Sequence, residues 1–224
     1  MNPISEVHNC DCMDYMKDIP DKFFQLALID APYGINISVS MGKRAKNKKS
    51  SYHKFSGNDS SIPDKFFFDE IFRISKNQII FGANHFISKI PFDSSCWIVW
   101  DKDNTGDFAD CELAWTSFNT AVRKFKFRWN GMLQGNMKDK QIRIHPTEKP
   151  IALYSWLIQK YAKQGDKILD THLGSGSIAL AIDKANKLDG MDLSFVGIEL
   201  DKDYFDSSIE RFKDNSRQTA FNFK

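Results

Sequence analysis

Cysteine is scarce in this sequence, and its spacing fits no known metal site. The residues are Cys10, Cys12, Cys96 and Cys111, and no two of them form a Cys-x-x-Cys pair. Zinc templates are built from such pairs. We therefore expect reduced, mostly buried thiols and no metal ion.

Long apolar runs and a dominant charge are also missing. No uninterrupted apolar segment reaches transmembrane length, and the first residues lack the apolar core of a signal peptide. The 31 Lys and Arg residues nearly balance the 29 Asp and Glu residues, for a net charge of +2. That balance does not mark a nucleic-acid-binding protein by itself, so the distribution of charge matters more. We expect a cytoplasmic protein without membrane contact.

The length and composition are those of an ordinary folded protein. The chain has 224 residues, of which 42% are hydrophobic and 27% are charged. This length is enough for one well-buried α/β domain with insertions. We therefore predict a single domain over residues 1–224.

Near the N-terminus, an apolar run is followed directly by residues that end a strand. Residues 23–29 have the length and composition of a buried strand, and Pro32 and Gly34 end it. Asp30 and Tyr33 are therefore expected at the carboxyl end of a strand. Open α/β sheets bind their ligands at that edge.

These residues suit methylation of an exocyclic amine on a nucleobase. The carboxylate of Asp30 and the carbonyl of Ala31 would accept the two amine hydrogens, which directs the nitrogen lone pair towards a methyl donor. Pro32 would fix the turn, and Tyr33 would stack on a base that has left its duplex. The alternative is an ordinary tight turn with an Asx-type cap.

A second strand end carries a glycine turn. Residues 167–170 predict a strand, and Gly174 and Gly176 follow shortly before a helix. Glycine allows the backbone to approach a ligand closely. Glu199 ends the next predicted strand, at residues 195–200, where its carboxylate can accept both hydroxyls of a ribose.

The glycine turn also matches the fingerprint of dinucleotide-binding enzymes. Gly174-x-Gly176-x-x-Ala179 has the required spacing, and Glu199 is near the expected ribose position. An NAD-linked oxidoreductase is therefore a rival. Against it, Asp170 would repel a pyrophosphate but favour a positive ligand, and only one β-α unit follows Glu199.

The hexapeptide His-Pro-Thr-Glu-Lys-Pro at residues 145–150 precedes a helix with an apolar face. Thr147 is expected to be its N-cap, and Pro150 is expected in its first turn. The positive end of the helix dipole would then meet the carboxylate of a ligand.

Basic residues concentrate in two stretches. Residues 41–54 contain lysine and arginine but no acid, and residues 121–129 mix basic with aromatic side chains. A solvated surface or a lysine-guarded sheet edge would give the same patterns. Contact with phosphates would make binding strongly salt-dependent. The residues that we expect to contact nucleic acid are Lys43, Arg44, Lys46, Lys48, Lys49, Arg123 and Arg128.

Together, these motifs resemble one family in their kind and order. Asp30-Ala31-Pro32-Tyr33 resembles the Asp-Pro-Pro-Tyr motif of amino-group DNA methyltransferases, which use S-adenosylmethionine (SAM), with Ala31 in place of the first proline. The glycine turn resembles their Asp-x-x-x-Gly-x-Gly loop. Residues 145–150 resemble the His/Thr-x-Lys-Pro segment of the beta class, in which the catalytic half precedes the SAM-binding half. The chain is identified as a member of this class, the N-4/N-6 DNA methylases of phage or restriction-modification type.

The resemblance implies a Rossmann-like α/β fold with a permuted motif order. The expected sheet is mostly parallel and seven-stranded, with one antiparallel edge strand. The catalytic half would span residues 1–118, the SAM-binding half residues 143–214, and the DNA-recognition loops residues 36–62 and 119–142.

The resemblance also implies the reaction. SAM would be the cofactor, and the methyl group would pass directly, without a metal, to N6 of adenine or N4 of cytosine in double-stranded DNA. The Asp form of the motif favours adenine. The residues expected to bind SAM are Asp11, His145, Thr147, Asp170, Thr171, Gly174, Gly176, Ser177 and Glu199.

Other functions stay open at this point. The alternatives are an RNA amine methyltransferase, the NAD-linked oxidoreductase and a non-catalytic nucleic-acid binder. Homodimers occur in the family, but no feature of this sequence argues for one. The implied location is the cytoplasm of a bacterium or of a phage-infected host.

Overall fold

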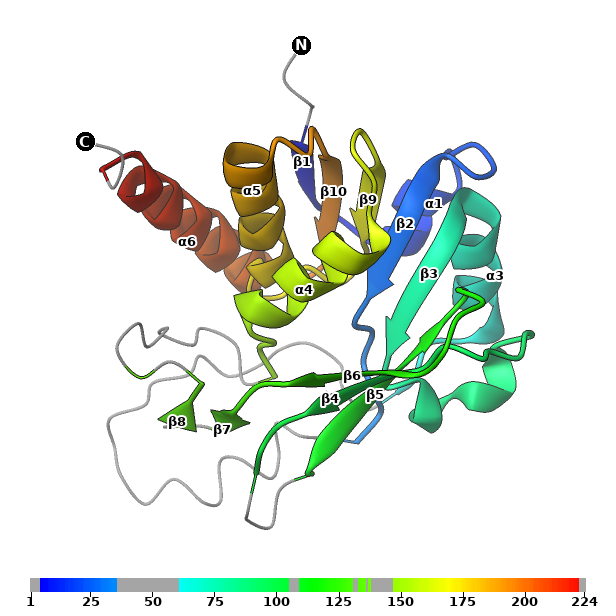
Figure 1. Ribbon diagram of the computed structural model, residues 1–224. Helices are drawn as coiled ribbons and strands as arrows, with labels where there is room; N and C mark the ends of the chain where they lie inside the picture. The colour runs from blue at the N-terminus through cyan, green and yellow to red at the C-terminus, as the bar shows by residue number, and fades with distance from the viewer. Residues whose placement is uncertain are drawn as a thin grey trace.

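A mixed β-sheet runs through the whole structure. The computed structural model describes residues 5–35, 61–104, 109–130, 133–135, 137 and 147–221. Within them, eight strands form one sheet in the order β1-β10-β9-β2-β3-β5-β4-β6 (Figure 1). These strands are β1 (Ser5–Asn9), β2 (Phe24–Ile29), β3 (Ser75–Phe81), β4 (Ile98–Asp101), β5 (Cys111–Thr116), β6 (Arg123–Lys126), β9 (Lys167–Asp170) and β10 (Ser194–Glu199). A separate pair joins β7 (Trp129–Asn130) to β8 (Leu133–Gln134).

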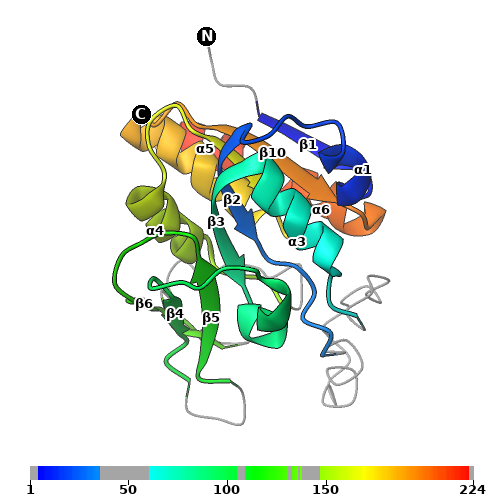
Figure 2. The same ribbon diagram turned by 90° about the vertical axis from the view of Figure 1, so that its right-hand side faces the viewer.

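Helices cover both faces of the sheet. Figure 2 shows α1 and α3 on one face, with α4 and α5 on the other. The α-helices are α1 (Cys12–Met16), α3 (Lys65–Ile74), α4 (Ile151–Tyr161), α5 (Ser177–Asp189) and α6 (Lys202–Phe221), and α6 packs against α5. Two 3₁₀ turns, η1 (Ala83–His85) and η2 (Ile87–Lys89), follow β3.

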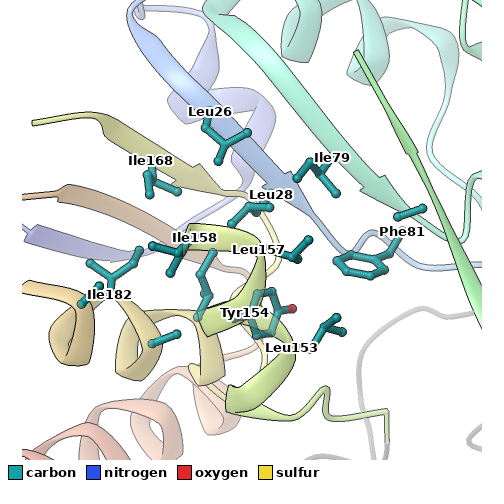
Figure 3. Close-up of a cluster of buried hydrophobic side chains, with 14 of the residues drawn as sticks. Leu26, Leu28, Ile79, Phe81, Leu153, Tyr154, Leu157, Ile158, Ile168 and Ile182 are labelled. Carbon is teal, nitrogen blue, oxygen red and sulfur yellow. The ribbon is translucent and has the colours of Figure 1, made fainter. Parts of the chain in front are cut away.

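The strand β2 shows why helices must pack on both faces of the sheet. Its side chains alternate, so that Leu26 and Leu28 join the cluster under α4 and α5, whereas Ala27 and Ile29 join the cluster under α1 and α3. Figure 3 shows the first cluster, where the side chain of Leu157 of α4 lies among those of the strands. A strand buried on both faces reads as a continuous apolar run, which is the pattern of residues 24–29.

The predicted mostly parallel α/β fold is confirmed, with two differences in the sheet. Strands β1, β10, β9, β2 and β3 are all parallel, and β5 is antiparallel to both β3 and β4. The described sheet has eight strands rather than seven, and its antiparallel strand is internal rather than at the edge. The reason is that β4 and β6 lie beyond β5, with β6 pairing only with β4.

The order of the strands differs from their order in the chain. β1, at the N-terminus, pairs with β10, near the C-terminus. β9 lies between β10 and β2, and β2 pairs in parallel with β3 after the crossover through α3. The strand before Asp30 therefore lies beside the strand before the glycine turn.

One prediction about a helix needs correction. Thr147 is not the N-cap of α4, which begins at Ile151 with Pro150 at the cap position. Helical geometry is disfavoured for the residue before a proline, which explains why Lys149 precedes the helix. No helix among the described residues has the length and apolar character needed to cross a membrane.

Candidate active site

The carboxyl edge of the parallel strands brings together several of the residues that the sequence predicts to be functional. β2 lies between β9 and β3 and is parallel to both, so Asp30, Asp170 and Gly82 lie where these strands end. Glu112 joins them from β5, which is antiparallel and therefore begins at this edge. The two strand ends singled out in the sequence are thus neighbours.

Asp30 is held through one of its two carboxylate oxygens. Its Oδ1 accepts hydrogen bonds from the Tyr33 hydroxyl at 2.9 Å and from Lys149 Nζ at 2.5 Å. No described residue donates a hydrogen bond to its Oδ2. The carboxylate is therefore oriented by one oxygen, while the other keeps its capacity to accept.

Lys149 is the cation at the centre of this cluster. Its side chain is only 3% exposed, and its Nζ lies 3.3 Å from Glu112 Oε2 as well as bonding Asp30. It also donates to the Tyr33 hydroxyl at 3.1 Å. Glu112 forms a second ion pair with Lys102. Two carboxylates therefore share one buried ammonium group.

The charges in the cluster stabilise one another. Burial raises the pKa of Glu112, but Lys149 and Lys102 outweigh burial and bring that pKa down to about 2. Burial lowers the pKa of Lys149, but Asp30 and Glu112 reverse the effect and hold it above its usual value. Burial and the same two carboxylates raise the pKa of Tyr33 well above its usual range. At neutral pH the cluster therefore contains an ammonium, a phenol and an ionised Glu112.

The ring of Tyr33 is packed closely against the end of β3. Gly82 has a φ of +65°, and a Cβ there would lie 2.1 Å from Tyr33 Cε1, so no larger residue fits. The exposed His85 ring stacks on Tyr33 with centroids 5.2 Å apart and an interplanar angle of 14°. Beside them, Pro32 is half-buried and the small side chain of Ala31 is fully buried in the α1 and α3 cluster.

The glycine turn is tied to the end of β10. Glu199 accepts the backbone N–H of Gly174 at 2.7 Å on Oε2 and that of Asp201 at 2.9 Å on Oε1. Gly176 is the N-cap of α5 with a φ of +71°, and Ser177 is the first, buried residue of that helix. Each carboxylate oxygen has two lone pairs, so Glu199 can still accept ribose hydroxyls.

Asp170 is a buried carboxyl with no described cation within ion-pair distance. Its Oδ1 accepts the backbone N–H of His172 at 2.9 Å, and the neighbouring Thr171 hydroxyl bonds the His172 ring at 2.9 Å. Burial raises the pKa of Asp170 to about 8; Asp30 and Glu199 add to the rise, and the His172 hydrogen bond opposes it. Burial lowers the pKa of His172 to about 4. A cationic ligand would compensate the Asp170 carboxylate.

Three further residues, Asp11, Thr147 and His145, are also predicted to bind the cofactor. Asp11 is the N-cap of α1, accepts the Met13 N–H at 2.7 Å and follows β1 at the same sheet edge. Thr147 is exposed just before the buried Glu148 and Lys149. His145 lies outside the described residues.

The predicted nucleic-acid contacts are only partly described. Residues 43–49, with Lys43, Arg44, Lys46, Lys48 and Lys49, lie outside the described part of the chain. Arg123 is exposed at the start of the edge strand β6. Arg128 forms an ion pair with Asp103 at 2.7 Å, which Lys126 shares at 2.8 Å. The positive charge on this side is therefore partly neutralised within the protein.

Sequence reasoning missed several residues of the site. Lys149 stands inside the quoted hexapeptide, but nothing local shows that its side chain is buried against Asp30. Glu112, Gly82 and His85 come from β5 and from the end of β3, and no motif marks them. One available signal was the pair of opposite charges at 148–149, directly before an apolar helix.

Comparisons with known proteins agree with this geometry. The family described as DNA methylase, of the N6/N4 methyltransferase type, matches residues 99–210. The type II methyltransferase M.HpaI of Haemophilus parainfluenzae is 34% identical over 73 residues, which cover 33% of this chain but only 21% of M.HpaI. The type II methyltransferase M2.MboI of Moraxella bovis is 23% identical over an alignment of 242 residues, covering 92% of this chain and 86% of M2.MboI.

Solved structures share the fold across nearly the whole chain. The M1.HpyAVI–SAM complex matches with a TM-score of 0.55 at 22% identity, covering 93% of this chain and all 100% of that one. TTHA0409 of Thermus thermophilus, complexed with S-adenosyl-L-methionine, has a TM-score of 0.58 at 15% identity, with coverages of 95% and 96%. The cytosine-N4-specific PvuII methyltransferase has a TM-score of 0.57 at 13% identity, with coverages of 94% and 89%.

These matches agree with the predictions of family, fold and cofactor. The fold is that of the SAM-dependent DNA methyltransferases, including two structures that hold SAM. The family match extends from β4, across the Lys149 segment and the glycine turn, into α6. The chain belongs to the N6/N4 family of DNA methylases.

Proposed function

We propose that this protein transfers the methyl group of SAM to the N6 amine of adenine in DNA. The observation that carries the proposal is Asp30 at the end of β2, oriented through Oδ1 and one strand away from the glycine turn that follows β9. Family membership supports DNA as the substrate and a base amine as the acceptor.

Asp30 would act on the target amine. Tyr33 and Lys149 fix Oδ1, so Oδ2 would accept one amine hydrogen and the carbonyl of Ala31 the other. An amine held in this way loses conjugation with the ring, and its lone pair becomes available for attack. Pro32 keeps the turn rigid, because its ring restricts the backbone.

Tyr33 would stack on the flipped base. Its hydroxyl is anchored by Asp30 and Lys149, and one face of its ring carries a flat heterocycle, the His85 imidazole, in this structure. Stacking of a base on an aromatic side chain contributes about 1–3 kcal/mol. Removing a base from its duplex costs a few kcal/mol, so stacking and the two amine hydrogen bonds offset the cost.

The second strand end has the chemistry that SAM requires. SAM, when bound, supplies a methyl group activated by a positive sulfur. Asp170 offers a buried carboxyl group without a described counter-ion, whose ionised form a positive ligand would favour, and Glu199 offers a carboxyl group that accepts the N–H groups of Gly174 and Asp201. Thr171, Gly176 and Ser177 would line the turn over the start of α5, with Asp11, His145 and Thr147 assisting.

The choice of adenine rests on the Asp form of the motif at residues 30–33. N4 of cytosine is the second candidate, since the cytosine-N4-specific PvuII methyltransferase has the same fold. Lys43, Arg44, Lys46, Lys48, Lys49, Arg123 and Arg128 remain the proposed DNA contacts. The NAD-linked alternative is disfavoured by the DNA methylase match, and a thermal-shift comparison of SAM with NAD tests it directly.

The test uses Asp30→Ala. Purified protein is incubated with SAM and mixed-sequence DNA, and the digested nucleosides are weighed by mass spectrometry. We expect N6-methyl-2′-deoxyadenosine from the wild type. The variant should bind SAM within about twofold of wild type but lose about 10²–10³-fold in methyl transfer, the range typical for one well-placed catalytic hydrogen-bonding group.

The test has a control variant and two outcomes that would contradict the proposal. Asp93→Ala removes an exposed carboxylate and should leave both measurements unchanged. N4-methyl-2′-deoxycytidine as the product would contradict the adenine assignment. Normal methylation by Asp30→Ala would show that the assigned role of Asp30 is wrong.

A further inference from the structure

Two consecutive residues, Glu148 and Lys149, have opposite charges, and their side chains are buried in different parts of the site. Glu148 is 3% exposed and Lys149 is 4% exposed. Lys149 reaches Asp30 and Glu112, as described above. Glu148 instead reaches Arg211 of α6, with its Oε1 2.8 Å from Arg211 Nη2. Because the two residues share a peptide bond, one short segment touches both sides of the proposed reaction.

Arg211 connects Glu148 to the glycine turn. Besides the ion pair, its Nη1 donates to the carbonyl oxygen of Ser175 at 2.9 Å and to Ser177 Oγ at 3.1 Å. Ser175 Oγ and Ser177 Oγ lie 3.0 Å apart. The guanidinium therefore holds both ends of the turn that leads into α5.

The arrangement is more than a surface ion pair. The side chain of Arg211 is 9% exposed and that of Glu148 is 0% exposed. Burial lowers the pKa of Arg211, although Glu148 opposes that change. A buried pair of this kind is weak evidence for stability alone, because well-packed apolar residues often replace it without loss. Its geometry, with one donor group and three separate acceptors, suits positioning.

We propose that Arg211 is a positioning residue for the methyl donor. Arg211 holds the turn at residues 174–177 in place relative to Glu148, and the neighbouring Lys149 holds Asp30. The turn proposed to bind SAM and the acid proposed to bind the amine are therefore both positioned by the segment at residues 148–149. The inference rests on the proposed function, since it assigns SAM to this turn. Neither Arg211 nor Glu148 needs to touch the substrate.

The first variant is Arg211→Lys. Lysine keeps a positive charge near Glu148, but a single ammonium lacks the planar fork that reaches several fixed acceptors. We expect the Kd for SAM, measured by calorimetry, to rise about tenfold. The KM for SAM should rise in parallel, whereas the KM for DNA and the thermal midpoint should stay close to wild type.

The second variant, Glu148→Gln with Arg211→Met, separates positioning from stability. It leaves no unpaired buried charge, so the folded state should be retained. The bonds to Ser175 and Ser177 are still lost, and the Kd for SAM should again rise about tenfold. Lys213→Ala, an exposed change on the same helix, is the matched control and should alter neither property.

Two results would overturn the proposal. If both folded variants bind SAM within twofold of the wild type, Arg211 has no positioning role, while the proposed function stands. If the wild type itself binds no SAM, the proposed function and this inference both fail. A rise in the Kd for SAM in both variants, with the KM for DNA unchanged, supports the inference.

Discussion

Two lysines contact Glu112, and they differ in what else they touch. Lys149 bridges Glu112 and Asp30, whereas Lys102 pairs with Glu112. Their side chains are 3% and 19% exposed, respectively. Lys149 thus links the proposed amine-binding acid to a second acid, and Lys102 does not contact Asp30.

Replacing Lys149 by Met should cost both stability and activity. The change leaves Asp30 and Glu112 facing each other without the shared ammonium, and removing one partner of a buried charge pair costs about 3–5 kcal/mol. Asp30 also loses one of the two bonds that orient it. We expect denaturant unfolding to show this loss, and methyl transfer to fall by at least about 10²-fold.

Lys102→Met is the matched control, because it removes a charge from Glu112 without touching Asp30. It should lower stability less than Lys149→Met does, because Glu112 keeps its ion pair with Lys149, and it should keep most of the activity. Adding Glu112→Gln to Lys149→Met should recover part of the stability but not the activity. Equal behaviour of Lys149→Met and Lys102→Met would contradict the special place given to Lys149.

At the scale of elements, the helix α5 has a left-handed glycine at each end. Gly176 is its N-cap with a φ of +71°, and Gly190 is its C-cap with a φ of +62°. A Cβ at Gly190 would meet nothing within 4 Å, whereas one at Gly176 would lie 3.2 Å from Ser208 Cβ. Both ends therefore need a residue with a positive φ, but only Gly176 has a neighbouring side chain that a Cβ would contact.

Alanine at these two positions should separate helix stability from ligand binding. Each change forces alanine into the left-handed region, at about 1–2 kcal/mol. Gly176→Ala should also raise the Kd for SAM several-fold, because Ser208 and the turn must shift, whereas Gly190→Ala should leave that Kd unchanged. Thermal unfolding and calorimetry measure the two effects, and equal SAM affinities would exclude a role for the turn geometry.

At the scale of the whole molecule, the carboxyl groups of Glu112 and Asp170 give the free energy of unfolding opposite dependences on pH. The folded pKa of Glu112 is about 2, below the ordinary 4.5, so its contribution is present above about pH 4.5 and is lost as the pH falls towards 2. The folded pKa of Asp170 is about 8, above the ordinary 3.8, so the folded state binds more protons between these values. Stability therefore decreases through that window as the pH rises.

Asp170→Asn should make the ligand-free protein more stable at alkaline pH. Asparagine needs no deprotonation, so the variant avoids a cost that develops between about pH 4 and pH 8 in the wild type. We expect little difference from the wild type near pH 4 and an advantage on the order of 5 kcal/mol near pH 8, because the pKa rises from 3.8 to about 8. Urea unfolding across this range measures it, and a constant difference would contradict the raised pKa of Asp170.

Much of the fold and part of the site follow from local sequence patterns. Residues 24–29 read as a strand because a chain buried on both faces must be apolar throughout. Asp30, Asp170 and Glu199 could be placed at strand ends because an apolar run followed by an acid and a turn is a local signal. The kind and order of the motifs were enough to indicate the family.

What the sequence by itself determined was therefore which side chains stand at the ends of strands. The tertiary structure alone decided their partners. Lys149 meets Asp30 across 119 residues of chain, and Arg211 meets Glu148 across 63. Such pairings depend on the order of strands in the sheet and on the packing of α6, which no local pattern encodes. A single buried charge produces no periodic pattern in the sequence, so its partners are known only from the folded structure.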